Sequence, residues 1–292
     1  MKAVFIDTHA HLQVSHFDAD RNEVIQRAFD AGVEKIIVVS TDVASGRQSL
    51  QLAEKYSGIY AAVGIHPTDC GESTEKDFFV IGELARHPKV VAIGEIGLDF
   101  YWKNVPPEIQ QRAFIRQLHL AKEMGKPVII HNREAGAAIL QTLHDAGITK
   151  LFGVFHCFSE NIDYAQRVLA LGCHVSFTGN LTYKKSTLPE VAAQIPLERI
   201  LLETDSPFMT PTPHRGKRNE PAYMIHVAEK LAEIRKIPAS EIARQTTANA
   251  VALFGLTEQF NNWLTDEPAN IIREHSSSFF TKKISRAKFS SR

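Results

Sequence analysis

Short apolar runs recur along most of the chain, separated by longer stretches in which apolar residues are spaced by three or four. The runs are rich in valine and isoleucine, which favour buried strands. They predict strands at residues 4–6, 35–40, 59–65, 90–94, 126–130, 151–155, 174–177 and 199–203.

The stretches between these runs have the spacing of amphipathic helices. In one of them Phe114, Leu118 and Ala121 share a face, and Gly32 follows another as a stop signal. Helices are predicted at residues 21–31, 44–56, 74–86, 108–124, 135–146, 161–171, 188–194, 222–236 and 240–254.

Strands that alternate with helices pair in parallel through right-handed crossovers. Eight such units in about 255 residues match a (β/α)8 TIM barrel in number and size. An open, doubly wound sheet is the structural alternative. The two folds differ in where the carboxyl ends of their strands lie, so the residues at those ends decide between them.

Six of the predicted strands end in residues that bind metals or transfer protons. In a barrel all these ends meet at one mouth, whereas an open sheet spreads them along a line. Convergence of the residues therefore requires a TIM barrel, which we predict. The residues are His9 and His11 on the first strand, His66, Glu95, His131 and His156 on the third to sixth, and Asp205 on the eighth.

His9 and His11 are two positions apart in an extended segment, so their side chains point the same way, with Cα atoms about 6.6 Å apart. Three of the other residues have ordinary alternatives: His156 as a buried core histidine, His131 as a loop residue and Glu95 as a helix cap. Together the side chains exceed the ligands of one tetrahedral ion. They predict two divalent ions about 3.5–4 Å apart, bridged by a carboxylate.

The composition is that of an ordinary globular protein, with 44% hydrophobic residues, 23% charged residues and a formal net charge of zero. Zero net charge argues against general coating of nucleic acid but allows a local basic patch. The three cysteines form no Cys-x-x-Cys pair, which disfavours disulfides and a cysteine zinc site. No apolar run approaches the roughly 20 residues of a membrane helix, and residues 3–6 are too short for a signal peptide. We therefore predict a cytoplasmic protein.

Seven short segments carry most of the chemistry-bearing residues. They are DTHAH (7–11), GIHP (64–67), GEIGLD (94–99), PVIIH (127–131), HCFS (156–159), LETDSP (202–207) and RGKRNEP (215–221). In this order they resemble the TatD family of metal-dependent deoxyribonucleases, within the amidohydrolase-like TIM barrels. The resemblance covers about residues 3–256, and the ordered set is highly specific although each segment alone is only moderately so.

The resemblance implies hydrolysis of DNA, single-stranded or at 3′ ends, with two divalent ions. Their identity, Zn²⁺, Mg²⁺ or Mn²⁺, is left open because these ligands accept several ions. In the family's pattern Glu95 bridges the two ions. The remaining ligands divide into His9, His11 and Asp205 for the first ion, and His131 and His156 for the second.

Glu95 and Asp205 are the catalytic candidates that the resemblance implies. Bound ions would neutralise phosphate charge and lower the pKa of a water toward about 7, and Asp205 would orient that water or accept its proton. Substrate oxygens would be contacted by four residues. These are His66, Arg133, Arg215 and Arg218.

Two segments that could contact a substrate also have ordinary explanations. The basic loop at residues 215–218 could simply be solvated. The aromatic residues 100–102 could stack on a base, but packing against the next helix explains them at least as well.

Two rivals remain. One is a lactonase, amidase or deaminase on the same scaffold, many of which bridge their metals with a carbamylated lysine. The fourth strand has Glu95 and no lysine before Lys103, which favours the nuclease. The other rival is a non-enzymatic binding barrel, which retention of every candidate ligand disfavours.

The predicted barrel domain covers residues 1–257, and residues 258–292 form a separate extension. Residues 275–292 contain Lys282, Lys283, Arg286, Lys288 and Arg292 and no acid. This composition predicts a basic, disordered tail. A solvated extension without a role and a segment that attracts nucleic acid are both compatible with it. No obligate protein partner is evident.

Overall fold

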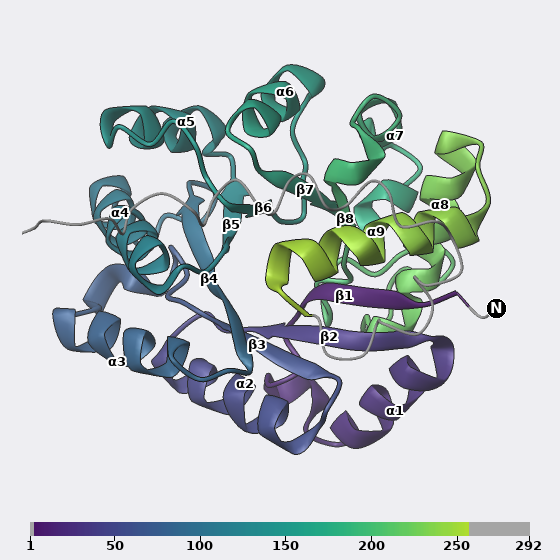
Figure 1. Cartoon of the computed structure of the whole chain (residues 1–292), viewed down its shortest axis with the longest axis horizontal. Helices are drawn as coiled ribbons and strands as arrows, with labels where there is room; N and C mark the ends of the chain where they lie inside the picture. The colour runs from purple at the N-terminus through teal and green to yellow at the C-terminus, as the bar shows by residue number, and fades with distance from the viewer. Residues whose placement is uncertain (1–2, 257–292) are drawn as a thin grey trace, which may run out of the picture. The chain divides into compact units, whose positions relative to one another are not determined.

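The computed structural model describes residues 3–256, and in it the strands form one parallel barrel (Figure 1). Strands consecutive in sequence are neighbours in the sheet, and a parallel bridge between Ala10 and Ser206 joins its two edges. The TIM barrel is confirmed, and the open sheet is excluded. The strands are β1 (Phe5–Ala10), β2 (Val33–Val39), β3 (Ile59–Val63), β4 (Val90–Asp99), β5 (Val128–Arg133), β6 (Gly153–Phe155), β7 (His174–Phe177) and β8 (Ile200–Leu202).

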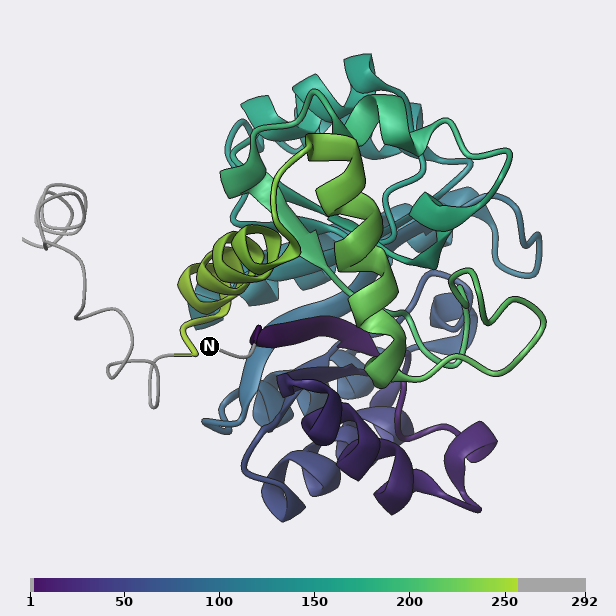
Figure 2. The ribbon, with the colours of Figure 1, turned by 90° about the vertical axis from the view of Figure 1, so that its right-hand side faces the viewer.

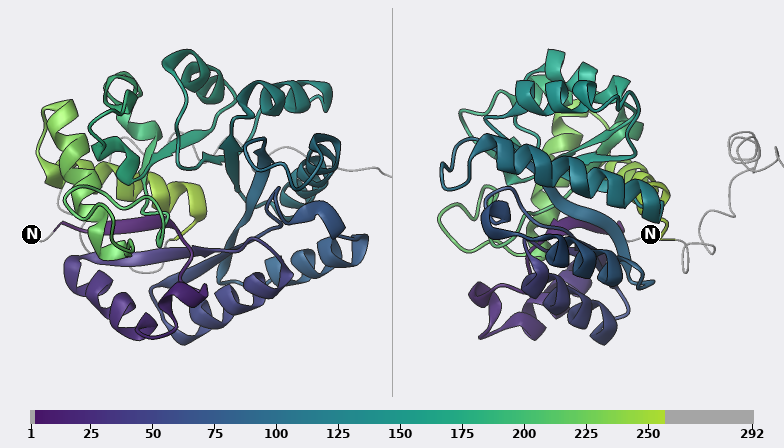
Figure 3. Two further views of the ribbon diagram at one scale, coloured as in Figure 1. Left: turned by 180° about the vertical axis from the view of Figure 1, so that it is seen from behind. Right: turned by 90° about the vertical axis from the view of Figure 1, so that its left-hand side faces the viewer.

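Helices surround this barrel, as seen from both sides in Figures 1 and 3. Each predicted helix is present, with ends that differ by at most two residues from those expected. They are α1 (Arg21–Ala31), α2 (Val43–Lys55), α3 (Glu75–Ala85), α4 (Pro107–Met124), α5 (Gly136–Asp145), α6 (Ile162–Ala170), α7 (Leu188–Ala192), α8 (Met224–Arg235) and α9 (Ala239–Phe254).

The last helix, α9, lies across the amino-terminal end of the barrel (Figure 1). Its Asn249 amide donates to the carbonyl oxygens of Leu197 and Ile200 at the start of β8, at 2.9 and 2.8 Å. Its Thr247 hydroxyl donates to the carbonyl oxygen of Val4, just before β1, at 2.9 Å. The helix therefore fixes this end of the barrel and leaves the opposite end for the loops that follow the strands.

Alternation along β2 shows how the barrel is filled. Ile36 and Val38 belong to the large apolar core, whereas Ile37 and Val39 are equally buried but lie outside that cluster. Successive strand residues point to opposite faces, so one pair packs toward the helices and the other toward the barrel interior. Burial on both faces explains the nearly continuous apolar runs of the sequence.

The fourth strand is longer than predicted, because β4 and β5 stay paired as far as Asp99 and Arg133. A register shift between Ile93 and Ile96 lets the pairing continue. Gly97 has a φ of +141°, and a Cβ there would lie 2.1 Å from the carbonyl oxygen of His131. Only glycine permits this approach. Glu95 therefore lies within its strand and not at its end, which corrects the predicted boundary.

Within residues 3–256, no helix has both the length and the apolar character needed to cross a membrane. The three cysteines are unpaired. The predicted boundary at residue 257 and the predicted basic tail at residues 258–292 lie outside the described residues.

His174, at the start of β7, provides a pH test of this fold. Burial lowers its pKa to about 4, with the positive charge of Arg199 contributing. The unfolded-state pKa of histidine is about 6.5, so the unfolded chain binds more protons between these two values. The contribution of neutral His174 to the free energy of unfolding is therefore complete above about pH 6.5. It is lost as the pH falls toward 4.

We expect His174→Gln to reduce the loss of unfolding free energy between pH 7 and pH 5 by about 1–2 kcal/mol. Urea denaturation at both pH values measures it. His119→Gln, at an exposed position on α4, is the control and should keep the wild-type dependence. Equal pH dependence in both variants would contradict the assignment.

Candidate metal centre

The predicted ligands converge at the carboxyl ends of the strands, which form the mouth of the barrel. Figure 2 shows the loops that follow β4 and β8 projecting on the side opposite α9. His9 lies in β1, His11 directly follows it, and Asp205 follows β8. Among the ligand candidates, His131 and Asp205 have the most exposed side chains, at 15% and 13%. The other four side chains are at most 6% exposed, so the cluster is largely shielded from water.

Four donor atoms gather on one side of the cluster, and we call them the first donor set. The Nε2 atoms of His9 and His11 are 3.1 Å apart. Asp205 Oδ1 lies 3.4 Å from His11 Nε2, and Glu95 Oε2 lies 3.4 Å from His9 Nε2. Donors bound tetrahedrally to one ion at about 2.0–2.2 Å are roughly 3.3–3.6 Å from one another. The distances within the first donor set range from 3.1 to 3.8 Å, close to this spacing.

The second donor set uses the other oxygen of the same glutamate. Glu95 Oε1 lies 2.6 Å from His156 Nε2 and 2.7 Å from His131 Nδ1. The two histidine nitrogens are 3.3 Å apart. Because each carboxylate oxygen of Glu95 faces a different donor set, this side chain has the position that a bridging ligand requires.

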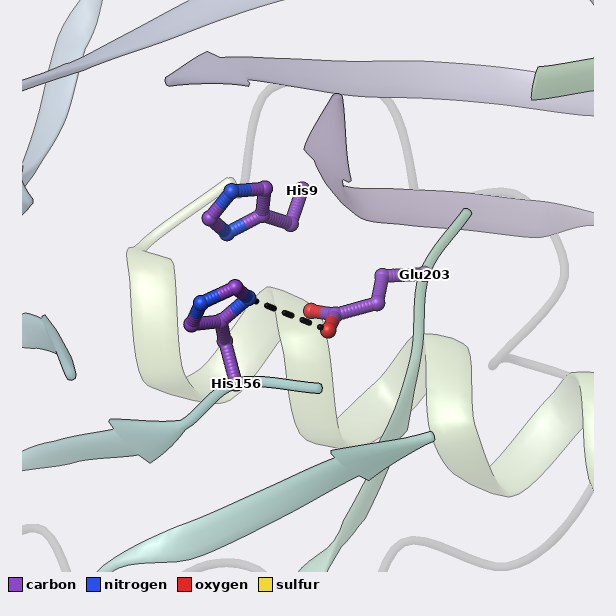
Figure 4. A group of neighbouring side chains, drawn as sticks. All are labelled: His9, His156 and Glu203. Carbon is purple, nitrogen blue, oxygen red and sulfur yellow. Dashed lines mark ion pairs between the residues drawn. The ribbon is translucent and has the colours of Figure 1, made fainter. Parts of the chain in front are cut away.

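Two carboxylates behind the histidines were missed as functional residues by the sequence reasoning. Asp99 Oδ2 lies 2.9 Å from His131 Nε2. Glu203 Oε1 lies 3.5 Å from His156 Nδ1 (Figure 4). The same oxygen accepts a hydrogen bond of 2.6 Å from the Cys157 amide. Histidines that bind metals are commonly oriented by such carboxylates.

A backbone group does the same for His11, whose Nδ1 lies 2.9 Å from the carbonyl oxygen of Val39. A signal for the two carboxylates was present in the sequence, since Asp99 closes the GEIGLD segment and Glu203 is two residues before Asp205. What the sequence could not supply was the pairing across strands that brings each acid to its histidine.

Asp7 joins the first and last strands beside the first donor set. Its carboxylate accepts hydrogen bonds from the Thr204 amide at 2.9 Å and from the Thr204 hydroxyl at 2.6 Å. Burial raises the pKa of Asp7 to about 7, although these hydrogen bonds lower it. The adjacent Asp205 amide donates to the carbonyl oxygen of His9 at 2.8 Å. These contacts fix Asp205 opposite His9 and His11.

Asp205 itself has a left-handed backbone conformation, with a φ of +54°. Such a conformation is tolerated by aspartate but costs of order 1 kcal/mol, and it persists where surrounding contacts impose it. Pro207 follows in the chain leaving the barrel. The turn directs the carboxylate toward the histidines, in agreement with its 3.4 Å distance from His11 Nε2.

The electrostatics of the cluster favour an ionised Glu95. Burial alone would raise its pKa, but His156, His66 and other nearby histidines hold it well below its usual range. Burial likewise opposes protonation of His156, yet the charges of Glu95 and Glu203 raise its pKa well above the usual value. Positive charge therefore balances the buried carboxylate, and a divalent cation would supply such charge at the same place. The donor set of imidazoles and carboxylates fits Zn²⁺, Mn²⁺ and similar ions.

His66 lies beside the second donor set in a different role. Its Nδ1 accepts a hydrogen bond from the Thr68 amide at 3.1 Å and lies 2.6 Å from the Thr68 hydroxyl oxygen. These contacts assign the proton of the neutral ring to Nε2, which lies 3.5 Å from Glu95 Oε1. His66 therefore offers a hydrogen-bond donor to a molecule in the mouth.

The three predicted arginine contacts differ in their surroundings. Arg133 and Arg215 are exposed, and their guanidinium carbons lie 3.8 Å from the ring centres of Tyr101 and Tyr183. Arg218 instead forms a bidentate pair with Asp20, at 2.8 and 2.7 Å. The contacts of Arg218 favour bracing of the loop, and its contact with substrate stays a prediction.

Comparison with known proteins agrees with this geometry. A family model described as TatD related DNase matches residues 6–255. An uncharacterized metal-dependent hydrolase of Bacillus subtilis, YabD, is 44% identical over 86% of this chain and 99% of its own. The 3′-5′ ssDNA/RNA exonuclease TatD of Escherichia coli K12 is 37% identical over 86% of this chain and 98% of its own. The crystal structure of YJJV, a TatD homologue from Escherichia coli K12, superposes with a TM-score of 0.82 at 37% identity, over 87% of this chain and 99% of the other.

Glu95→Gln tests the bridging position. Glutamine keeps the size but offers one carbonyl oxygen and no negative charge, so we expect fewer bound ions per chain and loss of activity. The melting temperature should change little, because the residue lies at the mouth and not in the packed barrel layers. Metal analysis after dialysis against Mn²⁺ measures the stoichiometry.

Glu190→Gln is the matched control, since Glu190 is exposed on α7. It should retain the metal content and turnover of the unaltered protein. Two tightly held ions and normal turnover in Glu95→Gln would show that the carboxylate bridges nothing.

Proposed function

Because the chain belongs to the TatD-related DNase family, a family of metal-dependent hydrolases, we propose that it hydrolyses phosphodiester bonds of single-stranded DNA from the 3′ end. The observation that carries the proposal is Glu95, whose two oxygens lie 2.6 Å from His156 Nε2 and 3.4 Å from His9 Nε2, one in each donor set. The relative named as an exonuclease for single-stranded DNA and RNA supports nucleic acid as the substrate class.

The proposed cofactor is a pair of divalent ions, Zn²⁺, Mn²⁺ or Mg²⁺. Both donor sets would hold one ion each, with Glu95 shared between them. Ions bound there supply positive charge to the phosphate and lower the pKa of a bound water. The residues of the chain then have to bind the strand, orient the phosphate and take up a proton.

Asp205 is the proposed proton acceptor. Burial would raise its pKa, but the hydrogen bond from His11 and the charge of His9 lower it below the usual value. The carboxylate is therefore ionised at neutral pH and able to orient water or accept its proton. Its Oδ1 is a member of the first donor set, 3.4 Å from His11 Nε2, so it would lie beside a water held there.

Phosphate binding is assigned to His66, Arg133 and Arg215. His66 donates from Nε2, and the two exposed guanidinium groups supply positive charge at the rim. These residues would hold the two non-bridging phosphate oxygens and the neighbouring phosphates of a strand. Arg218 would act mainly through Asp20, by fixing the loop that carries Arg215.

Hydrolysis of a small molecule, as by a lactonase, amidase or deaminase, is the alternative and is not favoured. Glu95 stands where many such enzymes have a carbamylated lysine. We further propose a cytoplasmic location, which the three unpaired thiols support.

A parallel assay tests the function. Metal-free protein is reloaded with Mg²⁺, Mn²⁺ or Zn²⁺ and given 5′-labelled single-stranded DNA, the same sequence as RNA, and a small phosphodiester. We expect the DNA to shorten stepwise from its 3′ end, and a phosphorothioate at the 3′-terminal linkage should slow this shortening. Hydrolysis of lactones or amides without cleavage of any oligonucleotide would refute the proposal.

Asp205→Asn tests the mechanism. Asparagine keeps a coordinating oxygen but cannot accept a proton at neutral pH, so turnover should fall by roughly 10²–10⁴-fold. Metal content and DNA affinity should persist if Asp205 serves the water, whereas metal content falls if it is mainly a ligand.

Asp163→Asn, at an exposed position on α6, is the control. It should match the unaltered protein in rate, metal content and melting temperature. Normal turnover in Asp205→Asn would rule out the proton-acceptor role, whatever its metal content.

A further inference from the structure

Exposed aromatic side chains collect around the mouth, and the metal centre does not account for them. Three of the six exposed large apolar residues within positions 3–256 follow β4 or β8. They are Tyr101, Trp102 and Phe208, with exposed fractions of 46%, 55% and 51%. Large aromatic side chains are usually more buried than these three.

Two arginine–tyrosine stacks are built into this rim. In the first stack the Arg133 guanidinium lies 3.8 Å from the Tyr101 ring centre and 5.7 Å from that of Trp102. In the second stack the Arg215 guanidinium lies 3.8 Å from the Tyr183 ring centre. Neither arginine has a carboxylate partner within the part of the chain that the structure describes. Both therefore present unneutralised positive charge beside an aromatic face.

The first stack is held beside the second donor set by one carboxylate. Asp99 Oδ1 accepts hydrogen bonds from the amides of Tyr101 and Trp102 at 3.0 and 2.9 Å. Its other oxygen, Oδ2, lies 2.9 Å from Nε2 of His131. The position of the aromatic loop is thus tied to a candidate metal ligand.

The second stack is held between the loops that follow β7 and β8. The Thr212 amide donates to the Thr182 hydroxyl at 2.9 Å, and Arg215 donates to the carbonyl oxygen of Thr210 at 3.1 Å. The two loops are in close contact, since a Cβ at Gly179 would lie 1.9 Å from the carbonyl oxygen of Met209. The loop after β8 also carries Asp205, whose Oδ1 belongs to the first donor set. Each stack therefore lies beside a different donor set.

The two stacks are separated along the rim by β6 on one side and by β1–β3 on the other. A phosphodiester held at the donor sets continues into one nucleotide on each side. We propose that the two stacks bind the nucleotides on opposite sides of the scissile phosphate, with each tyrosine stacking on a base and each arginine facing the adjoining phosphate. This inference rests on the proposed nuclease function and adds how the strand is held.

Stacking of this kind selects unpaired strands. The faces of bases in a duplex are already covered by neighbouring bases, whereas those of a single strand are free. An aromatic stack is worth a factor of roughly 5- to 100-fold in binding per base. Guanidinium groups add affinity that weakens with salt.

Half-substrates separate the two sides of the bond. Thymidine 5′-(p-nitrophenyl phosphate) has a nucleoside on one side only, and thymidine 3′-(p-nitrophenyl phosphate) on the other. Tyr101→Leu and Tyr183→Leu should each raise the KM for single-stranded DNA by roughly 5- to 100-fold. Each should also raise the KM of one half-substrate, and a different one in each variant.

Three controls distinguish recognition from damage. Tyr101→Phe and Tyr183→Phe keep the ring and should restore most of the affinity for DNA that the leucine variants lose. Phe79→Leu replaces an exposed ring on α3, which lies outside the rim, and should also leave the KM unchanged. Methyl p-nitrophenyl phosphate has no nucleoside, so its kcat/KM should change much less than that for DNA.

The outcomes are separable from failure of the nuclease function. If the unaltered protein cleaves DNA but both leucine variants keep its KM, only the present inference is wrong. It is also wrong if both variants raise the KM of the same half-substrate. A fall in kcat/KM for methyl p-nitrophenyl phosphate as large as that for DNA would contradict it too. If the unaltered protein cleaves no oligonucleotide, both proposals are overturned.

Discussion

The buried carboxylate of Glu95 is the interaction on which the site depends. A negative charge with so little contact with water is costly unless positive charge or hydrogen-bond donors surround it. Histidines surround it on both sides. The outer nitrogens of His131, His156 and His11 face Asp99, Glu203 and the carbonyl oxygen of Val39. The cluster is therefore an alternating arrangement of acids and imidazoles whose opposite charges balance one another.

The barrel brings the candidate ligands together, and local backbone features orient two of their side chains. Glu95 reaches both donor sets because β4 shifts register next to β5, where Gly97 allows the strands to approach. Asp205 reaches the first donor set because its backbone turns into the left-handed region beside His9. These departures from regular geometry are concentrated at the mouth, as is common where a site requires a fixed orientation.

The sequence predicted the fold well because its signals were local. Valine- and isoleucine-rich runs fix the strands, and spaced apolar positions fix the helices. It failed where a long-range contact decided the outcome. β4 continues through Glu95 only because β5 pairs with it. Glu203 contacts His156 only because β7 pairs with both β6 and β8 and so brings the ends of those strands together. The partner of Arg218, Asp20, is about 200 positions away, so no local pattern indicates that pair. The metal-binding role of the candidate ligands stays a prediction.

The contacts between the first and last strands determine when, during synthesis of the chain, the site can form. Asp7 and His9 are synthesised first, whereas Thr204 and Asp205, which contact them, emerge nearly two hundred residues later. The first donor set is therefore incomplete in any chain that ends before Asp205. The first donor set can therefore form only after the chain has been synthesised from β1 through β8.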